Sequence, residues 1–246
     1  MRFVTVAMAL SMASALACAA PASAGTAVVG QNLIVNGDAE AGAGSTDGGT
    51  VPVPGWNVTG GLTSVVYGAG GGFPSPGDAG PQNRGKNFFG GGVNTAASRA
   101  IQVIDLSAFS GAINAGQSQF NLSGWLGGYA TQGDNATLSA VFRDSTGQAL
   151  FSTSLAPVTP GERGGRTGMA YRDSLGLIPV GTALVDIVLD MRRVEGSYND
   201  GYADNLSFSV AAVPEPSSWA MLGAGLAMLG FVARKRRKSA SGTSAA

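Results

Sequence analysis

Two pairs of carboxylates are the residues whose type and spacing come closest to catalysis. Asp186 and Asp190 lie four residues apart in an alternating apolar stretch, and Glu195 and Asp200 follow them closely. Paired carboxylates are the groups with which glycosidases cleave sugar bonds. Asp186 and Asp190, however, alternate with apolar residues as a solvated strand face does, and residues 195–201 have the composition of an exposed loop. The sequence therefore favours a protein that is not an enzyme and leaves a glycosidase as the least favoured alternative.

Composition excludes several other kinds of chemistry. The 246 residues contain no histidine, which rules out Ser-His-Asp and Cys-His catalysis and histidine-ligated zinc. The single cysteine, Cys18, lies in a segment that we expect to be removed, so a disulfide is not expected to stabilise the remaining chain. Residues 25–212 hold nine basic and fourteen acidic residues, a net charge of −5. Nucleic acid is excluded as a partner because phosphate binding needs clustered Lys and Arg.

Aromatic side chains in or near predicted loops are the second group suited to a function. A flat aromatic face stacks on a sugar ring, and polar side chains at its rim supply hydrogen bonds. The candidate ligand-binding residues are Trp56, Tyr129, Tyr198 and Tyr202. Further aromatic residues with the same surroundings are Tyr67, Phe73 and Tyr171. For each of them, packing in the core is the favoured alternative.

The N-terminal residues have the three parts of a secretory signal peptide. Met1 and Arg2 form a short basic start, residues 3–20 are apolar, and Ala22 and Ala24 place small side chains at the −3 and −1 positions. We predict a signal peptide at residues 1–24, cleaved after Ala24. A membrane anchor is the alternative, although the apolar run is rich in alanine and short for a span.

The C-terminal residues form a second tripartite signal. Pro214, Glu215 and Pro216 are followed by an apolar segment at residues 219–233. A basic cluster then follows, composed of Arg234, Lys235, Arg236, Arg237 and Lys238. The apolar segment approaches the length of about 20 residues that a membrane helix needs, and the basic cluster holds its end on the cytoplasmic side. We predict a transmembrane sorting helix in the inner membrane, followed by a disordered tail at residues 239–246.

This order of motif, apolar segment and basic stop resembles the PEP-CTERM sorting signal of Gram-negative bacteria, over residues 213–238. The resemblance implies that a membrane enzyme, exosortase, recognises the Pro-Glu-Pro motif and processes the tail. It also implies export to the cell surface, the envelope or an extracellular polysaccharide matrix such as a biofilm. An ordinary single-span tail anchor is the alternative.

The middle of the chain, residues 25–212, has the pattern of one all-β domain. Short alternating stretches separated by Gly, Asn, Asp and Pro are typical of antiparallel strands in a β-sandwich. Strands are expected at residues 32–35, 62–67, 100–106, 120–126, 137–142, 149–155, 185–191 and 206–210. Asp144 to Gly147 predict a hairpin turn, and residues 42–54 and 68–85 are expected to be long loops. With weaker candidates included, the pattern predicts eight to ten strands.

Both ends of this domain resemble the jelly rolls of the galactose-binding-like and carbohydrate-binding-module superfamily. The similar stretches are residues 32–40, 54–56 and 202–208, with Ala39 in place of an aromatic residue and Asn205 in place of a carboxylate. The resemblance implies that the first and last strands lie together and that Glu40 and Asp204, with Asp38 nearby, hold a structural calcium. Calcium prefers such oxygen ligands. The alternative is that these carboxylates make local hydrogen bonds.

Together these features predict an exported, non-enzymatic bacterial cell-surface or extracellular-matrix protein that associates with exopolysaccharide. A carbohydrate-binding module that recognises exopolysaccharide is the alternative.

Overall fold

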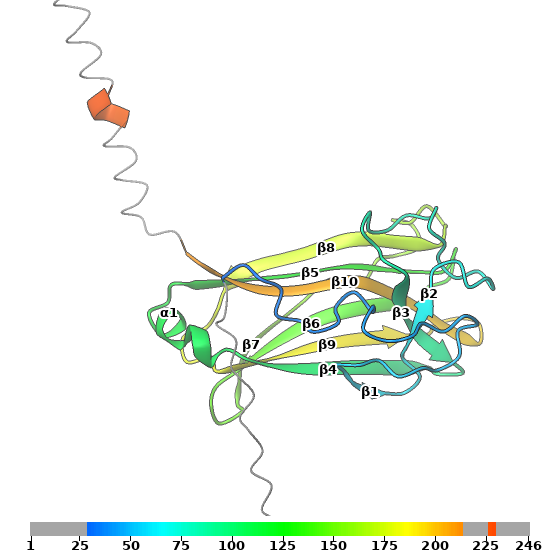
Figure 1. Cartoon of the computed structure of the whole chain (residues 1–246), viewed down its shortest axis with the longest axis horizontal. Coiled ribbons are helices and arrows are strands. Elements are labelled where there is room, and N and C mark those ends of the chain that lie inside the picture. Colours follow the sequence, from blue (N-terminus) through cyan, green and yellow to red (C-terminus); the bar gives the residue numbers. More distant parts are fainter. Residues whose placement is uncertain (1–28, 214–225, 230–246) are drawn as a thin grey trace, which may run out of the picture.

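The computed structural model describes residues 29–213 and 226–229, and its main feature is a sandwich of two antiparallel sheets (Figure 1). The predicted signal peptide, the Pro214–Pro216 motif, the basic cluster and the tail at residues 239–246 lie outside the described residues. Within the described part of the chain, no helix is long and apolar enough to cross a membrane. The predicted all-β antiparallel sandwich is confirmed.

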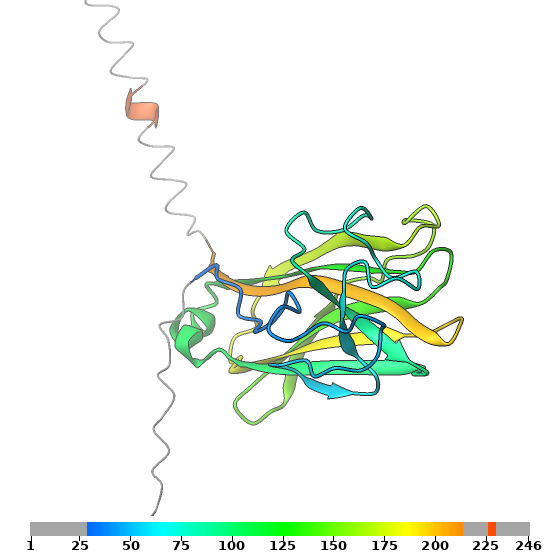
Figure 2. The same ribbon diagram turned by 45° about the vertical axis from the view of Figure 1, so that its right-hand side comes forward.

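The described residues form ten strands, five in each sheet, and we name each sheet after its central strand. The β9 sheet has the order β1 (Asn57–Thr59), β4 (Ala97–Asp105), β9 (Leu184–Arg192), β6 (Asn135–Arg143) and β7 (Ala149–Ser154). The β10 sheet has the order β2 (Thr63–Val66), β3 (Asn87–Val93), β10 (Tyr198–Ala212), β5 (Ser118–Gly128) and β8 (Gly168–Leu177). Two short helices, η1 (Ser107–Phe109) and α1 (Ser110–Asn114), connect β4 to β5 at the end of the sandwich where the chain leaves it (Figures 1 and 2).

The space between the sheets is filled by the inter-sheet core, to which β4, β5, β6, β9 and β10 contribute alternate residues. Three of its aromatic members, Phe120, Phe142 and Phe208, lie close together. The ring centroids of Phe120 and Phe142 lie 5.0 Å apart, and those of Phe142 and Phe208 lie 6.0 Å apart. All three side chains are buried. The alternation seen in the sequence at residues 120–126, 137–142, 185–191 and 206–210 is the pattern of this core.

A second apolar layer, the outer cluster, covers one end of the outward face of the β10 sheet. Its buried members are Val65, Tyr67, Phe88, Met169 and Tyr202. They lie on the face opposite to the inter-sheet core, because their chain neighbours Phe89 and Ala203 belong to that core. Phe73, from the loop at residues 68–85, lies against Phe88 and Tyr202 with ring centroids 6.3 and 6.4 Å apart. This predicted loop is therefore a cover over the sheet.

Three strands, β1, β3 and β8, have sequences without the expected alternation. In β3, Phe88 and Phe89 are buried on opposite faces and glycines follow them. Gly92 has a φ of +96°, and an added Cβ would overlap the carbonyl of Gly61. The edge strand β8 exposes two leucines, Leu175 and Leu177, on its outward face. Apolar residues on the exposed face give a pattern that differs from the usual one, in which the exposed face is polar.

The prediction of a strand at residues 32–35 is wrong, although this segment does lie beside the last strand. Leu33 N donates to Phe208 O at 2.7 Å. The Asn32 side chain then replaces backbone pairing: its Oδ1 accepts from Ile34 N and Phe208 N, each at 3.0 Å, and its Nδ2 donates to Leu206 O at 3.0 Å. Because a side chain takes these bonds, no regular ladder forms.

Candidate functional site

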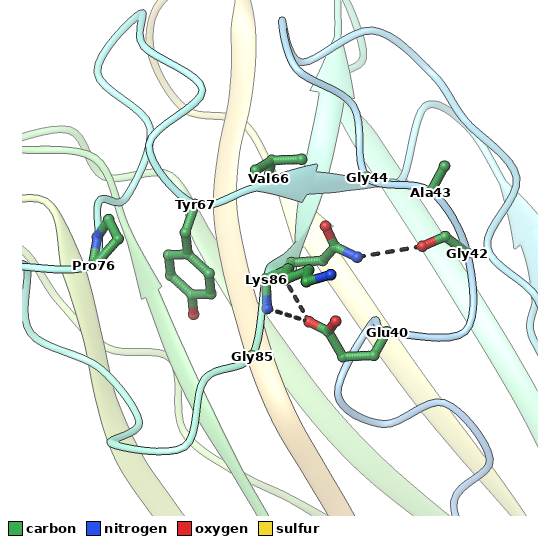
Figure 3. Close-up of a pocket in the computed structure, with 10 residues that line it drawn as sticks. Glu40, Gly42, Ala43, Gly44, Val66, Tyr67, Pro76, Gly85 and Lys86 are labelled. Carbon is green, nitrogen blue, oxygen red and sulfur yellow. Dashed lines mark hydrogen bonds between the residues drawn. The ribbon is translucent and has the colours of Figure 1, made fainter.

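All three predicted calcium ligands make hydrogen bonds, and those of Glu40 hold the start of the domain against the β10 sheet. Glu40 Oε1 accepts from Lys86 N at 2.6 Å and from Asn87 N at 2.7 Å (Figure 3). Asp204 is fully buried, and its Oδ2 accepts from the Tyr67 hydroxyl at 2.7 Å. Asp38 Oδ1 accepts from Glu40 N at 3.3 Å. These bonds are the local hydrogen-bonding role named as the alternative to metal binding.

The three carboxylates also interact through their charges. Burial above all, together with the nearby charges of Glu40 and Asp38, raises the pKa of Asp204 to about 7. A divalent cation would relieve this repulsion. Among the described residues, however, no group of three or more acidic or other metal-binding side chains is close enough to hold a metal. Any calcium would thus depend on backbone carbonyls as well, and the calcium site stays a prediction.

A pocket of about 510 Å³ lies beside Glu40, between the loop at residues 42–44 and the start of β3 (Figure 3). Two of its polar side chains have partners within the chain. Asn87 Nδ2 donates to Ala39 O at 3.1 Å, and the Tyr67 hydroxyl is bonded to Asp204. These bonds and those of Glu40 anchor the first loop beside the pocket.

The structure places the four predicted stacking residues mainly in packed surroundings. Trp56 is 9% exposed, and its Nε1 donates to Asn36 O at 3.0 Å. Tyr202 is fully buried in the outer cluster, where it donates to Asp200 Oδ1. Tyr129 is half-buried against the outer cluster, and the ring centroids of Tyr198 and Phe73 lie 4.9 Å apart. The prediction of ligand stacking is wrong for Trp56 and Tyr202, because their faces are covered.

An aromatic pair that does reach the surface lies on the outward face of the β10 sheet, on β5 and the edge strand β8. Trp125 on β5 stands directly opposite Tyr171 on β8. Their ring centroids are 5.9 Å apart at an interplanar angle of 62°, and Tyr171 is 49% exposed. They form one side of a hollow of about 410 Å³, the aromatic hollow. Its polar lining includes Asp38, Asn83 and Asn205.

A distortion of β10 directs Asn205 into the aromatic hollow. The pairing of β10 with β5 shifts register between Asp204 and Ser207, and Asn205 has a φ of +47°. Its Nδ2 donates to Asn83 Oδ1 at 3.0 Å, which links the last strand to the loop at residues 68–85. Bulges and left-handed non-glycine residues concentrate at functional sites because they redirect side chains at a cost in strain.

Sequence reasoning missed Trp125, Asn83 and Asn205 as members of one site. The available signal was the alternation at residues 120–126, which places Trp125 on the face opposite to Phe120 and Leu122. The position of Asn83 has no such signal, because its loop lacks periodicity.

Asp186 and Asp190, one of the two predicted carboxylate pairs, are each held by an arginine. Asp190 makes a bidentate pair with Arg99 at 2.6 and 3.0 Å, and Asp186 Oδ2 accepts from Arg143 Nε at 2.6 Å. Four strand residues separate the two carboxylates by roughly 13 Å, beyond the ~9.5 Å limit of an inverting glycosidase. Burial and nearby Asp134 raise the pKa of Asp200, which is bonded to Tyr202.

The two arginine–aspartate pairs line a shallow hollow of about 470 Å³ on the outward face of the β9 sheet, the β9 trough. Its apolar and hydroxyl lining between these pairs includes Ile101, Ser139, Val188 and Ser154. The trough lacks an aromatic side chain among its lining residues.

Several solved structures resemble the chain at low identity. The enzymatically active domain of bacteriophage CBA120 tailspike protein 4 is 15% identical with a TM-score of 0.44, and the match covers 74% of this chain but only 21% of that chain. A family 16 carbohydrate-binding module is 21% identical with a TM-score of 0.40, covering 72% of this chain and 99% of that one. The CBM22-1–CBM22-2 tandem domain of Paenibacillus barcinonensis Xyn10C is 16% identical with a TM-score of 0.41, covering 79% and 49%.

The C-terminal residues give the more specific match. No curated protein matches the sequence. Residues 212–237 match the family model of the PEP-CTERM protein-sorting motif, in agreement with the resemblance found in the sequence. The chain is therefore an exported protein that carries a PEP-CTERM signal for sorting to the cell envelope or surface.

Proposed function

We propose that this protein is a non-catalytic, glycan-binding component of the cell surface or extracellular matrix, and that the aromatic hollow binds exopolysaccharide. The observation that carries the proposal is the surface pair of Trp125 and Tyr171, 5.9 Å apart, beside polar amides. Aromatic rings present large faces to the C–H faces of a sugar, and amides supply directional hydrogen bonds to its hydroxyls.

The amides of the hollow keep free hydrogen-bonding capacity. One bond joins Asn205 Nδ2 to Asn83 Oδ1, so the Oδ1 of Asn205 and the Nδ2 of Asn83 are left to accept from and donate to a ligand. Because the bulge and this bond hold both side chains in place, little rotamer freedom is lost when a sugar binds. The site is thus preorganised on three strands and one anchored loop.

Absence of catalysis is part of this proposal. Asp186 and Asp190 are held by arginines, and their separation of roughly 13 Å along one strand exceeds the spacing of glycosidase pairs. Carboxylates engaged in this way act as surface ion pairs that stabilise the sheet face, each by a small amount.

We propose that exosortase processes the tail, after the apolar segment has held the precursor briefly in the inner membrane. The folded part continues to the motif without a linker, because Val213 N donates to Gln117 O at 2.9 Å. In a host with active exosortase, Glu215→Ala should leave a full-length precursor in the membrane fraction on immunoblots, whereas the wild type should appear as a shorter, released form. A wild-type protein that keeps its tail would favour a simple tail anchor instead.

A glycan array probed with the mature protein tests the binding proposal. Tyr171→Ala should weaken the strongest signal about tenfold, the effect of losing roughly 1.4 kcal/mol of binding free energy. Leu177→Ala is a matched control, since Leu177 is 63% exposed on the same face of β8 but outside the hollow. Equal signals from both variants and the wild type, or no signal on any glycan, would contradict the proposal.

A further inference from the structure

The charged side chains at the aromatic hollow are acidic. Among its lining residues, Asp38 is charged and exposed, and neither lysine nor arginine is present. Asp173 is exposed on β8, two residues from Tyr171 on the same strand face. A ligand in the hollow therefore meets negative charge at the rim.

The arginines closest in sequence to the hollow residues are turned to other partners. Arg84 donates to the carbonyls of Pro81, Ser75 and Asp78, with its guanidinium 5.2 Å from the Tyr67 ring centroid. Arg172 is paired with Glu162. Neither guanidinium is free to bind a sugar carboxylate, which in proteins is the usual role of a bidentate arginine.

We propose that the hollow selects amino sugars that carry a protonated amino group and discriminates against uronic acids, an inference that rests on the glycan-binding function proposed above. Asp38 accepts from Glu40 N through Oδ1, which leaves Oδ2 for an ammonium group. The amides of Asn83 and Asn205 bind the neutral hydroxyls of the same sugar. A uronic acid would bring its own carboxylate to this acidic rim without a cation to compensate.

The expected size of the effect follows from the exposure of the charges. One solvent-exposed ion pair changes affinity by about fivefold, and salt screens it over a distance of about 10 Å at 0.1 M. The selectivity should therefore shrink when salt is added, whereas stacking on Trp125 and Tyr171 should persist.

Calorimetric titration of the mature protein with three tetrasaccharides tests the inference. The probes are the tetramers of glucosamine, N-acetylglucosamine and galacturonic acid, at low salt and mildly acidic pH. We expect glucosamine to bind most tightly, N-acetylglucosamine about fivefold more weakly, and galacturonic acid most weakly. Asp38→Asn, which keeps an oxygen for Glu40 N, should remove the advantage of glucosamine and leave N-acetylglucosamine binding unchanged.

Glu195→Gln serves as the charge-matched control, because Glu195 is exposed outside the hollow. It should keep the order of affinities. The charge selectivity would be overturned if the galacturonic acid tetramer bound as tightly as the glucosamine tetramer. It would also be overturned if the Asp38→Asn protein kept the wild-type preference and melting temperature. Either result would leave glycan binding in place. Failure of all three sugars to bind, with Tyr171→Ala also inert on the array, would overturn the proposed function itself and the selectivity with it.

Discussion

The two faces of the β10 sheet carry apolar side chains for different purposes. The inward face, with Leu122 and Phe208, packs against the β9 sheet to form the inter-sheet core. The outward face carries the outer cluster at one end, including Phe88 and Tyr202, and the aromatic hollow beside it. One face of the sheet is therefore required for folding, while the opposite face is covered only where a loop crosses it and is open for binding elsewhere.

The largest expected effect separates these two faces. Phe208→Ala should lower the free energy of unfolding by about 3–5 kcal/mol, because a fully buried ring leaves a cavity between two sheets. Ser209→Ala, on the outward face of the same strand, should change it by less than about 0.5 kcal/mol. Denaturant unfolding of the domain measures both. Equal effects of the two substitutions would show that the faces do not differ as described.

Alternation in the sequence was sufficient to predict the inward face. Leu122, Phe142, Ile187 and Phe208 each lie in a strand whose apolar residues recur at every second position, and all four are buried in the inter-sheet core. Such a pattern depends only on the pleat of a strand, so it can be read without knowing which strands are neighbours.

The outward face could not be predicted in the same way. Tyr202 is buried because Phe73 and Met169, distant in the sequence, meet over it, and Asn205 points into the hollow because β10 bulges. Neither a covering loop without periodicity nor a register shift leaves a local signal. The same reason explains the errors at residues 32–35 and at Trp56, where side-chain hydrogen bonds to distant backbone groups replaced the expected roles.

The predicted calcium ligands give the next largest expected effect: Glu40 ties the first loop to the start of β3, and Asp204 ties β10 to Tyr67. If calcium binds the native state alone, saturation at about 100 times the dissociation constant adds about 2.7 kcal/mol of stability. Chelation should then lower the melting temperature, and Glu40→Ala or Asp204→Ala should abolish the difference between the two conditions. Identical melting curves with and without chelator would leave the hydrogen bonds of these carboxylates as their whole role.

A smaller effect is expected where the loop at residues 68–85 covers the outer cluster. Phe73→Ala should cost about 1–2 kcal/mol, since its half-buried ring contributes less than a fully buried one. The loop should also become sensitive to limited proteolysis while the strands stay protected. A loss of stability as large as that of Phe208→Ala would mean that Phe73 is as important for folding as the inter-sheet core.

The smallest effect is expected from Asp200, at the edge of the outer cluster. Burial and nearby Asp134 raise its pKa, so the native state holds this proton more tightly than the unfolded chain. Stability should therefore fall as the pH rises from about 4, the ordinary value, through the raised folded pKa. Asp204, with a pKa of about 7, acts in the same direction.

Asp200→Asn should remove part of this dependence, so that the slope of the unfolding free energy against pH becomes smaller. Urea unfolding at a series of pH values measures this slope. Asp105→Asn, which removes an exposed carboxylate at the end of β4, is the matched control and should retain the contribution of Asp200. An Asp200→Asn protein with the wild-type slope would mean that Asp200 is solvated in the native state.

Chemical-shift mapping of the isotopically labelled mature protein, titrated with the glycan that gives the strongest array signal, tests the central claim most directly. We expect the amide signals of Tyr171, Asn205 and Ser207 to shift together with the Trp125 indole, while those of Ile101, Ser139 and Val188 in the β9 trough stay in place. Shifts confined to the β9 trough, or the absence of shifts on either sheet, would contradict the assignment of glycan binding to the aromatic hollow.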